Sequence, residues 1–384
     1  MARARVGSTI KKKLGIVVYG DPFTGKSTFA SQLMYMHNED GSPLKVLYVD
    51  CESGSIDYYI DEIEEKGGNV EELYIVYTQS LGEVLELIDK IKNDDDFYLL
   101  DEETGEETDE VFLDKSGKPW RPDAMVIDGI TVLSSTVKQG LVEFSKKRAK
   151  VKADDAGLLG DARLVKIEGA GMELKDYNSV KFKQSNLILS LISSGIHWIC
   201  TAREADEKTY EKDSEGKQIS VSTGKKIPEG FGKDCEFNAH TSIRFTRDEY
   251  GDIIAICGKD RSGVHPYETI SNPQLTDWQV VIDKSAGKKE FVVKNDLESA
   301  VAIEQKIYTE EIMNSVGASS PTSSASSAKS IIDEINATMK GLTADGRTEK
   351  KNALTAASLP ATPSAIAKIT DTSTLNKILE IVKA

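Results

Sequence analysis

The sequence predicts an α/β fold in which helices cover both faces of a mostly parallel sheet. Short apolar, β-branched runs alternate with segments of helical periodicity, and this alternation is typical of a parallel sheet. A glycine-rich turn joins the first of these runs to the helix-like segment that follows it. The chain has 384 residues, enough for one large domain or two modest ones at about 100–200 residues per domain.

Five apolar runs are the expected parallel strands. They are short and rich in β-branched residues, as expected of strands that are buried on both faces. They lie at residues 14–20, 45–50, 73–78, 124–128 and 196–202. Between them, segments such as 81–92 and 132–144 have helical periodicity. Residues 241–261 predict two antiparallel strands around a turn at 249–251, so the sheet should end in antiparallel strands.

Changes in composition suggest how the chain is divided. We expect a basic N-terminal arm at residues 1–13, a core at 14–310 with an acidic insertion at 94–114, a Ser/Ala-rich linker at 311–329, and a small helical module at 330–384. In the last segment, Leu375, Ile378, Leu379 and Val382 share one helical stripe. This module is expected either to bind a protein partner or to dock as a cap.

The overall composition excludes several classes of protein. Acidic residues number 63 against 48 basic ones, and the net charge of −15 argues against general affinity for nucleic acid but not against a local basic groove. The four cysteines form no C-x-x-C pair, which argues against a zinc knuckle or a disulfide framework. No apolar run reaches the roughly 18 residues of a membrane span. We therefore expect a cytoplasmic protein without a membrane segment.

The strongest motif is GDPFTGKST at residues 20–28, which fits the phosphate-binding pattern G-x-x-x-x-G-K-[S/T]. Gly20 and Gly25 let the backbone curl so that N–H groups point at phosphate oxygens. Lys26 supplies a positive charge to the terminal phosphates, and the Ser27 hydroxyl can bind Mg²⁺. The expected nucleotide contacts are Gly20, Asp21, Pro22, Phe23, Thr24, Gly25, Lys26, Ser27 and Thr28.

Acidic residues follow two of the predicted strands. Asp128 ends the fourth strand, where an acid beside the phosphate loop can hold Mg²⁺ through water; it could instead cap the next helix. Asp50 and Glu52 follow the second strand, and either could orient a water molecule for attack on a phosphate. An acid just past a strand could also be ordinary surface.

Taken together, GDPFTGKST, VDCES and AMVIDGI resemble the RecA-like ATPase core. The resemblance implies that Glu52 activates water and that ATP and Mg²⁺ are the cofactors. Residues 199–204, ICTARE, lie where the family has a sensor strand, which points to Thr201 and Arg203 in place of the family's frequent Gln. In GKDRSG, residues 258–263, Lys259 and Arg261 resemble the Lys and Arg that one subunit inserts into its neighbour's ATP site. Two residues apart on a strand, they share a face.

A longer stretch, DYNSVKFKQSNLILSLISSGIHWICTARE, is similar to phage-encoded RecA-like ATPases of the single-strand-annealing type. This resemblance covers roughly residues 14–290. It implies an oligomer, either a ring or a filament, that binds single-stranded DNA and supports recombination and strand annealing. It also implies that DNA stimulates ATP hydrolysis and that the protein acts in the host cytoplasm.

Two stretches of this chain are candidates for DNA contact. Residues 138–152 carry an excess of positive charge, and residues 205–233 form a polar loop in which lysines and acids are interleaved. Binding of single strands needs such charge and usually adds stacked aromatic rings, for which Phe144, Tyr210 and Phe231 are available. The candidate basic residues are Lys138, Lys146, Lys147, Arg148, Lys150, Lys152, Lys225 and Lys226. A solvated helix face and a loop are the alternative interpretation.

Two other functions remain open from the sequence. The same core could serve a replicative helicase or a DNA translocase, although no N-terminal collar domain is evident in the 13 residues before the first strand. It could also serve a nucleotide-switched assembly protein that does not bind DNA and whose charge of −15 serves protein partners.

Overall fold

A computed structural model provides the structure of the chain. It describes residues 10–292 apart from 102, 106, 213–215 and 217, and then residues 297, 300–307, 324–342, 344–357, 359–361, 366, 369 and 371–383. The chain forms two compact units, Met1–Leu297 and Glu298–Ala384. Most of the expected N-terminal arm and residues 311–323 of the expected linker lie outside the described residues.

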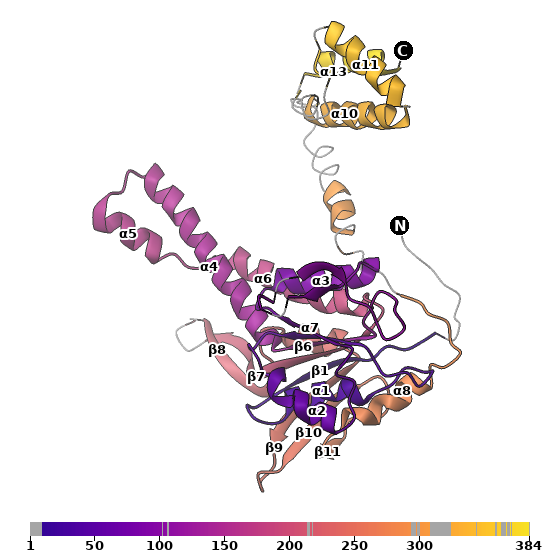
Figure 1. Ribbon diagram of the computed structural model, residues 1–384. Helices are drawn as coiled ribbons and strands as arrows, with labels where there is room; N and C mark the ends of the chain where they lie inside the picture. The colour runs from indigo at the N-terminus through magenta and orange to yellow at the C-terminus, as the bar shows by residue number, and fades with distance from the viewer. Residues whose placement is uncertain are drawn as a thin grey trace. The chain divides into compact units, whose positions relative to one another are not determined.

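The first unit is built on a nine-stranded sheet (Figure 1). Its order is β11-β10-β9-β1-β7-β6-β2-β3, with β8 paired to β7 alone. The strands from β9 to β3 are parallel to one another, whereas β10 and β11 continue the sheet in antiparallel fashion. The strands are β1 (Gly15–Gly20), β2 (Val46–Asp50), β3 (Leu73–Tyr77), β6 (Ala124–Asp128), β7 (His197–Lys212), β8 (Gln218–Pro228), β9 (Thr241–Arg247), β10 (Ile253–Asp260) and β11 (Thr269–Ser271).

Helices cover both faces of this sheet because its central strands bury side chains in both directions. In β1, Val17 and Tyr19 belong to one core cluster, while Ile16 and Val18 belong to the other. The first face is covered by α3 (Leu81–Asn93), α4 (Ile130–Asp155), α6 (Leu174–Ile192) and α7 (Gly232–Asn238). The second is covered by α1 (Lys26–Ser31), α2 (Ile60–Glu65) and α8 (Gln279–Asp283). The predicted fold class is confirmed.

Two segments extend beyond the layers. The outer part of α4 projects with α5 (Gly160–Glu168) as a helical arm (Figure 1). Strand β7 is buried only over its first six residues and then continues, largely exposed, into a hairpin with β8. The polar segment expected at residues 205–233 as a loop is therefore mainly this β-hairpin, followed by α7.

The acidic insertion contains a short two-stranded hairpin of β4 (Tyr98–Leu100) and β5 (Glu107–Val111). Aromatic side chains anchor its base to the core. The ring of Phe97 lies 5.2 Å from that of Trp120 and 5.5 Å from that of Tyr74, measured between centroids. Such edge-on contacts add to the free energy gained by burial, so apolar packing anchors the base of the charged hairpin.

The second unit is a small helical module with its own core. It contains α10 (Ser324–Gly341), α11 (Ala344–Ala356) and α13 (Thr372–Lys383). In α13, Leu375, Ile378 and Val382 are buried and Leu379 is partly buried, so the predicted stripe does face a core. None of the described helices is long and apolar enough to cross a membrane.

Candidate nucleotide site

The phosphate-binding loop follows β1 at the carboxyl edge of the parallel strands. Gly20 has a φ of +148°, and a Cβ at this position would lie 1.8 Å from the carbonyl oxygen of Phe245 in β9. Only glycine fits there. Gly25 has a φ of +82° and precedes the first residue of α1. The first hydrogen bond of that helix runs from the Phe29 N–H to the Gly25 carbonyl, so the N–H groups of residues 26–28 have no partner within the helix and can bind an anion.

The loop borders a cavity of about 680 Å³. All nine predicted loop residues line it, together with the predicted Glu52, Asp128, Thr201 and Arg203. The structure thus brings together residues from four separate segments of the chain. The other residues of the lining were not predicted from the sequence to belong to this site: Ser55, Tyr59, Gly129, Ala202, Glu204, Lys226 and Glu229.

Lys26 is a half-buried cation at the floor of this cavity. Its Nζ donates a hydrogen bond to the Asp21 carbonyl oxygen over 2.5 Å. Burial lowers the pKa of Lys26, while the nearby carboxylates of Glu52 and Asp128 raise it in part. No described carboxylate forms an ion pair with Lys26, so its charge is available to the phosphates of a bound nucleotide.

Asp128 is a buried carboxylate surrounded by hydroxyl groups. Its Oδ1 accepts a hydrogen bond from the Ser27 hydroxyl over 3.1 Å and another from the Thr201 hydroxyl. Its Oδ2 accepts hydrogen bonds from Tyr48 and Ser55, each over 2.8 Å. The hydroxyl of Ser27 and the carboxylate of Asp128 are the oxygen ligands that Mg²⁺ prefers, so these residues fit the predicted metal site.

The alternative role of Asp128 as a helix cap is wrong. The residue that precedes α4 is Gly129, and no side chain caps this helix. The Gly129 N–H instead donates a hydrogen bond to the Thr201 hydroxyl over 2.8 Å. Thr201 therefore connects Asp128 to the start of α4, a suitable place for a residue that responds to the nucleotide.

The structure distinguishes the two acids that follow β2. Asp50 is 1% exposed, and its carboxylate accepts hydrogen bonds from the backbone N–H groups of Glu52 (2.8 Å), Gly54 (3.0 Å) and Ser55 (2.6 Å). It shapes the loop, because its oxygens are occupied by that loop's backbone. Glu52 lies at the start of this loop, two residues after Asp50, and lines the cavity.

Glu52 is held by the second predicted sensor residue. Nη2 of Arg203 lies 3.2 Å from Oε1 of Glu52, and both side chains are partly exposed. Gly129 makes room for this glutamate, because a Cβ at Gly129 would lie 2.7 Å from Cγ of Glu52. The carboxylate of Glu52 therefore has a defined position beside the phosphate loop.

Charged residues at the base of the β7–β8 hairpin also border the cavity. Glu204 forms two hydrogen bonds with Arg244, of 2.8 and 3.3 Å. Lys226, predicted to contact DNA, lies 3.0 Å from Asp206 and 3.4 Å from Glu204 and lines the nucleotide cavity. These residues could not be assigned to the site beforehand, since only the pairing of β8 with β7 brings Lys226 back to the phosphate loop.

Lys259 and Arg261 lie at the opposite edge of the sheet from the phosphate loop. The Arg261 N–H donates a hydrogen bond to the His240 carbonyl oxygen, next to the start of β9. As expected, the two side chains share a face: Lys259 Nζ and Arg261 Nη2 lie 2.8 and 3.4 Å from the Phe237 carbonyl oxygen. They do not line the nucleotide cavity of their own chain, and their action on a neighbouring subunit remains a prediction.

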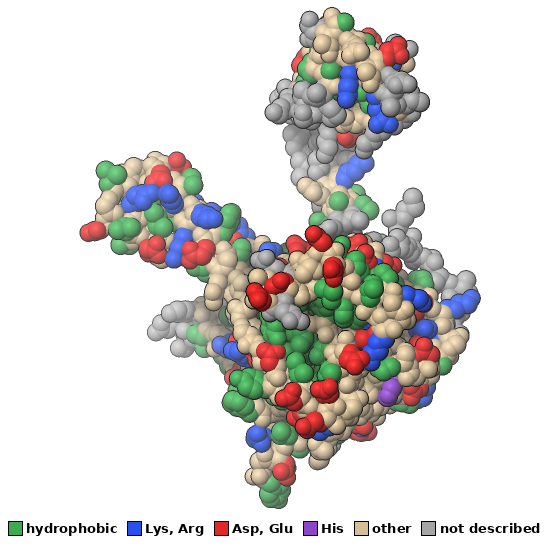
Figure 2. All heavy atoms as spheres, in the orientation of Figure 1, with side chains coloured by type: hydrophobic (Ala, Val, Ile, Leu, Met, Phe, Trp, Pro, Cys, Tyr) green, Lys and Arg blue, Asp and Glu red, His purple; other side chains and the backbone are tan. Residues whose placement is uncertain are grey.

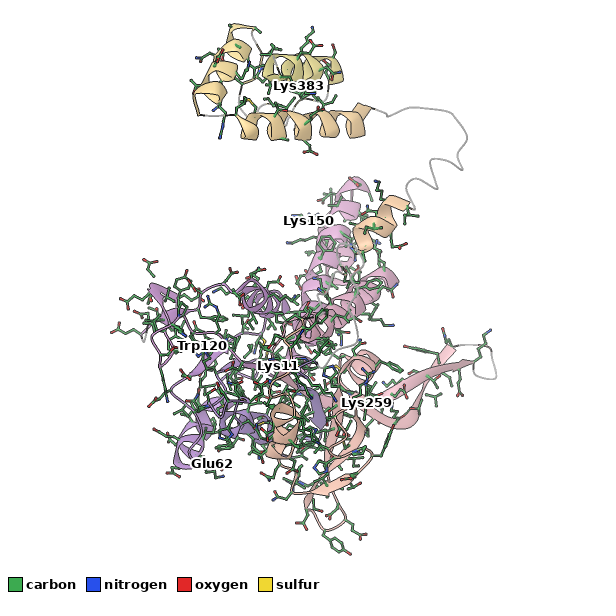
Figure 3. All side chains as sticks on the ribbon, turned by 90° about the vertical axis from the view of Figure 1, so that its right-hand side faces the viewer. Lys11, Glu62, Trp120, Lys150, Lys259 and Lys383 are labelled. Carbon is green, nitrogen blue, oxygen red and sulfur yellow. The ribbon has the colours of Figure 1, made fainter. Side chains whose placement is uncertain are left out.

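The remaining candidate DNA contacts divide into two groups. Lys146, Arg148 and Lys152 of α4, and Lys225 of β8, form ion pairs with acidic side chains. The other group has no ion pair within the described part of the chain and consists of Lys138, Lys147 and Lys150. Figure 3 labels Lys150 on the projecting arm and Lys259 on the body of the unit. Figure 2 shows acidic and basic side chains interspersed on the arm.

Comparison with known proteins identifies a family and similar solved structures. A family model described as an AAA domain matches residues 12–236. No curated protein matches the chain. Among solved structures, a KaiC-like protein from the hyperthermophilic archaeon Pyrococcus horikoshii is 14% identical with a TM-score of 0.35, covering 70% of this chain and 99% of that protein.

Proposed function

Because the chain belongs to the AAA domain family, which identifies it as a P-loop ATPase, we propose that it hydrolyses ATP with Mg²⁺, assembles into a RecA-like oligomer and binds single-stranded DNA. The observation that carries the proposal is the convergence of Lys26, Ser27, Glu52 and Asp128 on one cavity. In a phage-type recombination system such a protein would support strand annealing.

The residues of the cavity suit the hydrolysis of a phosphoanhydride. Lys26 and the N–H groups of the loop hold the β- and γ-phosphates. Mg²⁺, held by the Ser27 hydroxyl and by Asp128 through water, would neutralise charge on the same phosphates. Glu52 orients a water molecule and takes its proton as the water oxygen attacks the γ-phosphorus and the bond to ADP breaks. Thr201 and Arg203 hold Asp128 and Glu52 in place.

Single-stranded DNA is the proposed polymer partner, and the projecting arm is the proposed site of contact. Support comes from Lys138, Lys147 and Lys150, which have no ion pair in the described chain. Phe144 is 53% exposed, and the guanidinium of Arg148 lies 5.3 Å from its ring. An exposed aromatic ring on a helix that also carries unpaired cations suits nucleobases and phosphates. The helical module at the C-terminal end is a proposed contact for a protein partner.

The test is ATP turnover with and without single-stranded DNA, combined with DNA binding at two salt concentrations. We expect turnover that requires Mg²⁺ and rises with DNA, and affinity that falls as salt rises. Turnover without any binding of DNA at low salt would leave an ATPase and remove the DNA role.

A second candidate is a nucleotide-switched assembly protein that does not bind DNA. The net charge of −15 favours it, as do the ion pairs that occupy Lys146, Arg148 and Lys152 on the arm. The experiment above distinguishes the two, since this candidate predicts no DNA affinity at low salt.

A further inference from the structure

Helix α6 presents an exposed face that lies outside the nucleotide cavity, because no described residue of this helix lines that cavity. Phe182 on this face is 72% exposed, and Tyr177, about 140° around the helix axis from it, is 49% exposed. Lys175, Lys181 and Lys183 are exposed on the same helix. Large apolar side chains exposed singly are common, but here two aromatic rings lie among three lysines within nine residues.

The geometry of the helix places Phe182 on the crest of this face. Val180, Gln184 and Leu187 are buried and define the inner side of α6. Successive residues turn by about 100° around a helix axis, so Phe182 points away from Val180, and Lys181 and Lys183 flank it on either side. An exposed ring is thus bracketed by two ammonium groups.

Two of the three lysines of α6 carry a charge that no described acid neutralises, whereas the third, Lys175, lies 2.8 Å from Glu173. Asp176 is the sole acidic residue of α6; it is 5% exposed, and Arg148 occupies its carboxylate with two hydrogen bonds. Lys181 and Lys183 form no ion pair within the described part of the chain. This contrasts with α4, where Lys146 and Arg148 are paired.

Helix α4 runs antiparallel beside α6 and brings a third aromatic ring to the same pair of helices. The Gln184 side chain donates a hydrogen bond to Ser134 over 2.8 Å, and Arg148 bonds Asp176. Phe144 lies between Ser134 and Arg148 along α4, with the guanidinium of Arg148 against its ring. The two helices thus carry exposed rings and cations along a shared length.

We propose that the outer face of α6 binds single-stranded DNA, with a nucleobase stacked on Phe182 and neighbouring phosphates held by Lys181 and Lys183. This inference rests on the proposed function and assigns the DNA a specific surface on α6, beside the projecting arm. Unpaired bases expose the flat faces that an aromatic side chain can stack on, whereas a duplex buries them. The two flanking cations match a polyanion.

The test measures binding of a fluorescent oligothymidine to the full-length chain at several salt concentrations. Phe182→Ala should weaken binding about 5- to 160-fold, the range of a lost base–aromatic stack, and Phe182→Tyr should restore it. Replacing both Lys181 and Lys183 by alanine should reduce the salt dependence, the slope of log K against log salt, by about 1.4, or about 0.7 for each phosphate contact.

Matched controls lie elsewhere on the same unit. Tyr250→Ala removes an aromatic side chain that is 82% exposed in the turn between β9 and β10. A double variant of Lys118 and Lys284 to alanine removes the same charge from exposed positions. Both controls should bind DNA as the unaltered chain does, and all variants should hydrolyse ATP normally without DNA, because none of these residues lines the nucleotide cavity.

The outcomes separate this inference from the proposed function. Absence of binding by the unaltered chain at low salt would overturn both. Binding by the unaltered chain that Phe182→Ala and the lysine double variant leave unchanged would overturn this inference alone. Variants that lose self-association but keep full DNA affinity would also overturn it, because the face would then bind a second copy of the chain.

Discussion

Replacing Gly129 with alanine should slow ATP hydrolysis and leave ATP binding almost unchanged. Gly129 has a φ of +97°, and an added Cβ would lie 2.7 Å from Cγ of Glu52. Ordinary van der Waals contact begins at 3.4 Å, so the two groups must separate by about 0.7 Å. Glu52 is the more mobile partner, because Gly129 is fixed by its hydrogen bond to Thr201.

The expected magnitude follows from that displacement. A catalytic group misplaced by about 1 Å can cost on the order of 10²-fold in rate, so kcat should fall roughly 30- to 100-fold. The phosphate loop itself does not move, so affinity for ATP should change less than about 3-fold, or under 0.7 kcal/mol. A left-handed backbone costs a non-glycine residue about 1–2 kcal/mol, which should lower the free energy of unfolding by that amount.

The assay combines steady-state turnover, calorimetric titration with ATP, and thermal unfolding. Gly140→Ala is the matched control, because Gly140 lies in α4 and a Cβ there meets nothing within 4 Å. It should stabilise the chain by about 1 kcal/mol through helix propensity and leave turnover intact. Adding Gly129→Ala to Glu52→Gln should reduce ATP turnover little further, because Gly129→Ala acts through Glu52. Normal turnover by Gly129→Ala, or a loss of ATP affinity as large as the loss of kcat, would refute the reasoning.

The remaining predictions concern catalysis, assembly and pH. Glu52→Gln should bind ATP normally and lower single-turnover hydrolysis by about 10²- to 10⁴-fold; unchanged hydrolysis would mean that another group activates the water. Arg261→Ala should impair hydrolysis but not binding, and mixing it with Lys26→Ala should restore part of the activity; no restoration would count against action across a subunit interface. Burial lowers the pKa of His197 to about 3 from a usual 6.5, so unfolding takes up a proton between these values. The free energy of unfolding should therefore not depend on His197 above about pH 6.5. Toward pH 3 it should fall by up to about 1.4 kcal/mol per pH unit. Denaturant titrations at several pH values should show that the free energy of unfolding depends less on pH in His197→Asn. An unchanged dependence on pH would exclude His197 as its source.

Much of the fold and the centre of the site could be predicted because their signals are local. The loop from Gly20 to Thr28 must have its glycines and its lysine at set spacings, and the structure places Asp128 and Glu52 beside it. The choice between Asp50 and Glu52 could not be made from the residues themselves, and only the resemblance to the RecA-like core favoured Glu52. The choice depends on which carboxylate the backbone of the loop occupies, and that requires coordinates.

The site residues and ion pairs that could not be predicted from the sequence depend on contacts between distant segments of the chain. Lys226 is 198 residues beyond Thr28, the last residue of the phosphate loop, and only the β7–β8 hairpin places it at the cavity. Likewise, the excess of positive charge in residues 138–152 does not show that Arg148 bonds Asp176 of another helix. A count of charges along the sequence therefore overestimates the free cations on the arm.

The central claim is that the loop from Gly20 to Thr28, together with Asp128, binds ATP and its metal. Calorimetric titration of the full-length chain with ATP, in the presence and absence of Mg²⁺, tests it most directly. We expect saturable heat that requires Mg²⁺ and that Lys26→Ala largely abolishes, because the terminal phosphates then lose their counter-charge. No heat from the unaltered chain, or equal heat from Lys26→Ala, would contradict the claim.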